Sequence, residues 1–86
     1  MKKYTFLVEF RGGTYISQHI EEDIYGALKT WAASLDTSIY PQRIIKKLQK
    51  EIVGEEPSPI TGVENVWCCA FIPYNSFLLL NIIETA

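Results

Sequence analysis

Cysteine is scarce in this sequence, and the position of its two cysteines argues against a disulfide-rich secreted domain. Two of the 86 residues are cysteines, and they are neighbours, Cys68 and Cys69. Adjacent residues on a strand point to opposite faces, so these two side chains cannot easily bridge each other. A secreted domain of this size usually carries several disulfides, so we expect a cytoplasmic protein.

The sequence also lacks an excess of basic charge and a long hydrophobic run. Eight basic and ten acidic residues give a net charge of −2, which provides no general attraction to nucleic acid or to an anionic membrane. The most apolar tract, residues 77–83, is too short to span a bilayer. No signal-peptide core follows the basic start Met1-Lys2-Lys3. We therefore expect neither a nucleic acid nor a membrane as partner.

A hydrophobic fraction of 48% in a chain of this length predicts one folded domain over residues 1–86. Alternating apolar residues predict a strand from Lys3 to Phe10. Both glycines of the pair Gly12-Gly13 tolerate positive φ, so a two-residue turn at this pair should lead into a second strand, Thr14 to Ile20. The predicted cross-strand neighbours are Phe10 with Tyr15 and Phe6 with His19.

Two helices should follow this hairpin. The acidic run 21–23 favours a helix N-terminus, and apolar side chains then recur at helical spacing as far as Leu35. Pro41 suits the first turn of the second helix, and Gly54 closes it.

Two more strands, Val63 to Ile72 and Phe77 to Ile83, are rich in β-branched, aromatic and aliphatic residues. A turn at residues 73–76 joins them and places Ile72 opposite Phe77. The sequence thus predicts an α+β fold of order β-β-α-α-β-β, a four-stranded antiparallel sheet with both helices on one face. The last strand is apolar on both sides, so it should lie centrally, beside the first strand.

The two faces of the last two strands carry the main functional prediction. The face predicted to lie under the helices carries Trp67, Cys69, Phe71, Leu78, Leu80 and Ile82. The interface residues predicted on the opposite face are Val66, Cys68, Ile72, Phe77, Leu79, Asn81 and Ile83. Soluble proteins seldom expose such an apolar patch, so we expect a homodimer that packs sheet against sheet. In the rival arrangement, the second helix or the Pro57–Pro59 loop crosses over and covers this face.

Side chains capable of chemistry are few. His19 with the acidic run 21–23 is the only cluster of potential metal ligands, but it offers no second histidine, and acidic helix N-termini are common for electrostatic reasons. Ser17 and His19 share a strand face, yet Ser17 has no nucleophile elbow. Cys68 and Cys69 fit buried packing thiols. We therefore expect no catalytic residue, no metal, no cofactor and no enzymatic activity.

The basic face of the second helix has two interpretations. It consists of Arg43, Lys46, Lys47 and Lys50. It could meet phosphates or an acidic protein, or it is the solvated side of an amphipathic helix. The negative net charge and the lack of a framing motif favour the second interpretation.

Residues 4–9, a glycine-containing turn and the helical pair Ala27-Leu28 form a recognisable series. Over residues 3–35 this series resembles the opening strand-strand-helix unit of HicB-type antitoxins. The chain departs from that family because it lacks the segment that normally separates the second strand from the helix, and it has no DNA-binding tail. The resemblance implies a small partner-binding protein.

Two functional hypotheses stay open. In the first, the chain is a non-catalytic protein-interaction module that self-associates, with an antitoxin-like or immunity-like role as one instance. In the second, it is a small-ligand-binding domain or a small enzyme with a pocket between sheet and helices. The residues expected to line that pocket are Tyr4, Tyr15, Trp31 and Trp67.

Overall fold

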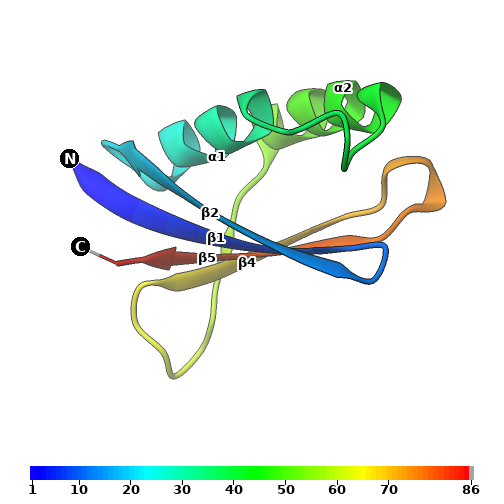
Figure 1. The fold of residues 1–86 in the computed structure, drawn as a ribbon. Coiled ribbons are helices and arrows are strands. Elements are labelled where there is room, and N and C mark those ends of the chain that lie inside the picture. The colour runs from blue at the N-terminus through cyan, green and yellow to red at the C-terminus, as the bar shows by residue number, and fades with distance from the viewer. Residues whose placement is uncertain (86) are drawn as a thin grey trace.

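Five antiparallel strands and two helices make up the computed structural model, which describes residues 1–85 (Figure 1). The strands are β1 (Lys2–Phe10), β2 (Gly13–Glu21), β3 (Ser58–Pro59), β4 (Val66–Phe71) and β5 (Leu78–Glu84). The helices are α1 (Ile24–Ala33) and α2 (Gln42–Glu51), and a 3₁₀ turn, Ile52–Gly54, follows α2 directly. Both helices lie on the same side of the sheet (Figure 1). The predicted α+β class and the two helices are therefore confirmed.

The sheet has the strand order β2-β1-β5-β4-β3. Strand β5 therefore lies centrally, between β1 and β4, as its two apolar faces predict. The two edges of the sheet are β2, with nine residues, and β3, with two.

The prediction of four strands is wrong, because β3 adds a fifth strand between α2 and β4. Ser58 pairs with Cys68 and Pro59 pairs with Trp67, at the edge of the sheet. Proline has no N–H to donate to a ladder, so within sheets it is confined to edges, strand starts and bulges. The prolines that indicate a loop in the sequence therefore fit a strand that is short and lies at an edge.

The β1–β2 hairpin has a register that differs by two residues from the predicted one. Arg11 and Gly12, with φ of 49° and 79°, form the turn, and Phe10 pairs with Gly13. Gly13 belongs to β2 and lies beside the ring of Tyr15, which a Cβ atom on Gly13 would overlap. A shift of two residues leaves every side chain on its predicted face. The observed pairs are Val8 with Tyr15, Phe6 with Ser17 and Tyr4 with His19.

The β4–β5 hairpin has the predicted register. Phe71 pairs with Leu78, which is the pair that follows Ile72 opposite Phe77 in the predicted ladder. The turn is formed by Tyr74 and Asn75, with φ of 49° and 63°. The N–H of Ser76 donates to the carbonyl oxygen of Pro73 at 2.9 Å and closes this turn.

One cluster of buried side chains fills the space between the sheet and the helices. The predicted covered face of β4 and β5 belongs to this cluster, although Trp67 is only half-buried. Helix α1 begins after Asp23, whose carboxylate accepts a hydrogen bond from the Gly26 N–H at 2.8 Å. The helix ends at Ala33, so Leu35 lies beyond it but still packs against the core.

Candidate functional site

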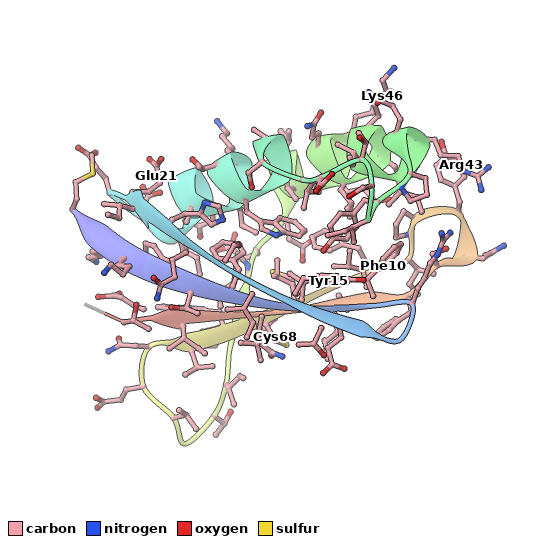
Figure 2. The ribbon with its side chains drawn as sticks, viewed as in Figure 1. Phe10, Tyr15, Glu21, Arg43, Lys46 and Cys68 are labelled. Carbon is pink, nitrogen blue, oxygen red and sulfur yellow. The ribbon has the colours of Figure 1, made fainter. Side chains whose placement is uncertain are left out.

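The side of the sheet that faces away from the helices, which we call the open face, carries the predicted interface residues that belong to β4 and β5, while Ile72 and Phe77 lie just beyond the ends of these strands. Because Cys69 and Leu80 are buried under the helices, their neighbours on each strand point to the open face. Ile72 and Phe77 are 64% and 55% exposed. The others are half-buried: Val66, Cys68, Leu79, Asn81 and Ile83. Figure 2 shows Cys68 on this side of the sheet.

Helix α2, one part of the rival arrangement, does not cover the open face. It stays beside α1 on the other side of the sheet (Figure 1). The proposed covering loop instead contains β3, which pairs with β4 within the sheet. The chain that leads into β4 projects on the open side as a loop (Figure 1).

The half of the open face formed by β1 and β2 is more polar. Gln18 donates from Nε2 to the Thr5 hydroxyl at 3.1 Å. Two isoleucines of β2, Ile16 and Ile20, interrupt this polar surface and are 66% and 58% exposed. The apolar side chains of the open face are therefore concentrated on β4 and β5, and we call them the apolar patch.

A groove of about 340 Å³ lies between β2 and the connector that joins α1 to α2. Tyr15 and Trp31 line it as predicted, whereas Tyr4 and Trp67 do not. Instead, Tyr4 belongs to the buried cluster and Trp67 packs against it, and their ring centroids lie 6.4 Å apart. The remaining lining residues are Val8, Thr14, Ile16, Ser17, Ser34, Leu35, Asp36, Ile39 and Tyr40.

Tyr40 is the aromatic lining residue that the sequence analysis missed. Its ring centroid lies 5.8 Å from that of Tyr15, and burial raises the pKa of its hydroxyl to about 12, so the hydroxyl stays protonated. An apolar residue directly before a helix N-cap often packs onto the first turn of that helix, and Tyr40 directly precedes the N-cap Pro41. That position is the sequence signal that could have identified it.

Asp36 is the only charged residue among the described residues that line the groove. The backbone N–H of Ser38 donates to its carboxylate at 2.9 Å. Hydrogen bonds from Ser38 lower the pKa of this carboxyl group. The groove therefore has aromatic and aliphatic walls with one negative charge on its rim.

Ser17 and His19 approach each other on β2, as their shared strand face predicts. Ser17 Oγ and His19 Nε2 share a hydrogen bond of 3.0 Å. Burial lowers the pKa of His19, and the charge of Glu21 opposes that shift. Glu21 accepts a hydrogen bond from the Thr30 hydroxyl at 2.8 Å, which joins β2 to α1. The geometry provides a hydrogen-bonded pair of which Ser17 lines the groove and His19 does not.

The two cysteines occupy opposite faces of β4, as strand alternation predicts. Cys69 is buried, and Cys68 is half-buried on the open face. Burial raises the pKa of the Cys69 thiol to about 12, so it does not supply a thiolate near neutral pH.

The predicted basic residues of α2 are all exposed: Arg43, Lys46, Lys47 and Lys50. Figure 2 shows Lys46 on the outer side of the helix layer and Arg43 at the end of this layer, beside the turn between β4 and β5. The guanidinium of Arg43 lies 5.2 Å from the ring centroid of Tyr74, and Lys47 Nζ lies 4.0 Å from Glu51 Oε1. These contacts tie part of the basic face to residues of the chain itself.

Within residues 1–85, no three histidine, cysteine, aspartate or glutamate side chains come together in a geometry that would hold a metal ion. Neither helix of this part of the chain is long and apolar enough to cross a membrane.

No family model, curated protein or solved structure matches this chain. Its function is therefore argued from its own geometry.

Proposed function

We propose that this chain is a small protein-binding module that performs no chemistry of its own and that self-associates through the open face of its sheet. The observation that carries the proposal is the apolar patch that the half-buried side chains of β4 and β5 form on the open face, with the exposed Ile72 and Phe77 just beyond the ends of these strands. Apolar surface of this kind, when it is continuous, marks protein–protein contact sites in soluble proteins. An antitoxin-like or immunity-like role is one instance of such a module.

The charges of the open face also support pairing with a second copy. Lys3 and Glu9 lie near opposite ends of β1, and both side chains point to this face. When two copies stack with their β1 strands antiparallel, the lysine of one copy approaches the glutamate of the other. A twofold axis makes both contacts equivalent. The scarcity of cysteine supports a cytoplasmic location for this dimer, because a secreted domain of this size usually carries several disulfides.

A variant pair tests the proposal. Leu79→Lys should dissociate the dimer into folded monomers, because its side chain points to the open face. Leu80→Lys should unfold the chain, because it buries an unpaired charge under the helices. Val53→Lys is the matched control, since Val53 is 77% exposed on the 3₁₀ turn after α2 and should leave both mass and fold unchanged.

Sedimentation velocity and circular dichroism on these variants give the result. If Leu79→Lys unfolds the protein while Leu80→Lys leaves it folded, the assignment of faces is inverted. If Leu79→Lys and Val53→Lys have the same mass as the wild type, the open face is not the contact.

The groove beside β2 favours a second candidate function, a small-ligand-binding domain. Its three aromatic rings, with Thr14, Ser17 and Asp36, combine apolar walls with a few polar groups, which is the usual composition of a ligand pocket. A thermal-shift screen with nucleotides, metals and metabolites separates the two candidates. A reproducible, saturable shift favours a ligand-binding domain.

A further inference from the structure

The two edges of the sheet are unequally protected against pairing with another chain. Proteins usually protect edge strands with prolines, charged residues, bulges or very short strands. β3 has two residues, one of which is Pro59. β2 has nine residues in unbroken register with β1, and between Gly13 and Ile20 it has no proline and no lysine, arginine, aspartate or glutamate. β2 is therefore the edge on which a further strand can form.

The turn of the hairpin fixes which backbone groups of β2 are free. The residues that flank a two-residue turn form a hydrogen-bonded pair, and such pairs then alternate along an antiparallel ladder. Phe10 and Gly13 are that first pair, so the backbone groups of Tyr15 and Ser17 point to β1. The residues whose N–H and C=O groups point outward are Thr14, Ile16, Gln18 and Ile20. In the part of the chain that the structure describes, no other strand pairs with β2.

The groove lies on the helix side of this free edge. β2 itself contributes Thr14 to Ser17 to the groove wall, and the connector after α1 contributes the opposite wall. Alternate side chains of a strand point to the same side, so an added strand would direct every second side chain toward the groove. Trp31 and Tyr40 would receive an apolar side chain there.

The charges around β2 indicate which peptide fits. Asp36 stands on the rim of the groove, and the acidic run 21–23 lies at the end of β2. Arg11, at the other end, donates to the Ser76 hydroxyl at 3.1 Å. A basic side chain in the added strand is therefore favoured beside Asp36.

A second copy of β2 paired about a twofold axis at Ser17 fits this position less well. In that arrangement, the side chains that approach the groove are Ser17 and His19 of the other copy. These side chains are polar and already hydrogen-bonded to each other. An apolar anchor is absent from that arrangement.

We propose that β2 binds an extended peptide segment of a partner protein by strand addition, with an apolar side chain in the groove and a basic side chain beside Asp36. This inference rests on the proposed function in one respect, namely that the partner is a protein. It does not depend on the dimer, because the groove and the open face lie on opposite sides of the sheet.

Selection from a displayed library of random dodecapeptides tests the proposal. Peptides enriched on the wild type should contain apolar residues at alternate positions and a lysine or arginine. Ile16→Pro removes an outward N–H without removing a bond to β1, so these peptides should bind it at least tenfold more weakly. Asp36→Asn keeps the shape of the side chain and should weaken the basic peptides only. No enrichment on the wild type, or equal binding to Ile16→Pro, would overturn the proposal.

Amide hydrogen exchange of the wild type with the best enriched peptide gives a second test that needs no variant. The peptide should slow exchange at Thr14, Ile16, Gln18 and Ile20. The amides of Tyr15 and Ser17 are already bonded to β1 and should change little. The same peptide with N-methyl groups on its central amides should lose both binding and protection.

The outcomes of this test are distinct from those of the dimer test. Protection at these four amides without peptide, increasing with protein concentration, would mean that a second copy occupies the edge, and the peptide proposal would be wrong. A peptide that slows amide exchange only in β4 and β5 would overturn the proposal as well. The molar mass of the protein in solution, measured separately, tests whether it forms a dimer.

Discussion

At the scale of the residue, the face of β4 that a side chain occupies determines its chemical behaviour. Cys69 and Cys68 are adjacent and chemically identical, but Cys69 lies in the core and Cys68 on the open face. A polar replacement at Cys69 would bury a hydroxyl among apolar side chains, whereas the same replacement at Cys68 keeps contact with water.

Cys69→Ser should therefore lower the free energy of unfolding by about 1–3 kcal/mol, which is the usual cost of a buried polar group without a partner. Cys68→Ser should lower it by about 0.5 kcal/mol or less. Urea denaturation of each variant under conditions that keep it monomeric measures both values. Equal losses would contradict the placement of the two thiols.

His19 provides a test at the same scale through pH. Burial lowers its pKa in the folded protein, so the folded state binds a proton less readily than the unfolded chain, whose histidine titrates near about 6.5. Stability is then complete above that pH and is lost as the pH falls toward the folded-state pKa.

His19→Gln should reduce the loss of stability between about pH 7 and about pH 5, because it removes the titrating group. Denaturant midpoints at both pH values, for the wild type and the variant, give the comparison. An unchanged slope would show that His19 is not the group responsible.

At the scale of the element, the β1–β2 hairpin depends on the contact between Tyr15 and Gly13. The ring of Tyr15 occupies the space in which a Cβ atom on Gly13 would lie. The backbone of Gly13 does not have a positive φ, so the requirement for glycine comes from the ring alone.

A double-mutant cycle tests this reasoning. Gly13→Ala should destabilise the wild type by about 1–3 kcal/mol, the usual cost of overpacking. In the Tyr15→Ala background the same change should be neutral or slightly stabilising, because alanine has the lower conformational entropy in the unfolded chain. Thermal denaturation of the four proteins gives the coupling energy, and a value near zero would refute the contact.

The sequence predicts these elements well where local patterning determines them, and less well where packing does. Alternation from Lys3 to Phe10 predicts β1, and the apolar character of β5 predicts its central position. The turn at Arg11-Gly12 was not predictable, because Gly12 and Gly13 both tolerate positive φ and strand alternation does not choose between registers that differ by two residues. β3 was missed because its prolines are typical of a loop.

The candidate site shows the same division. The hydrogen bond between Ser17 and His19 follows from strand alternation, and the structure confirms that the two side chains meet. The groove was only partly predictable, because Tyr40 belongs to the connector between α1 and α2, which is distant from β2 in the sequence. Strand period specifies the face of a residue, but not which helix or connector covers it.

At the scale of the whole molecule, one sheet has a covered face and an open face, and one long edge and one short edge. The helices cover one face, and Pro59 in β3 protects the short edge against pairing with another strand. The open face and the β2 edge have no such partner within residues 1–85. The proposed dimer and the proposed peptide site assign one partner to each.

Self-association through the open face is the central claim, and the molar mass of the wild type in solution tests it most directly. Light scattering on a concentration series that reaches high micromolar should give twice the chain mass of 9.8 kDa. A mass that stays at one chain over the whole series would contradict the dimer, because the apolar patch over β4 and β5 would then be stable in contact with water.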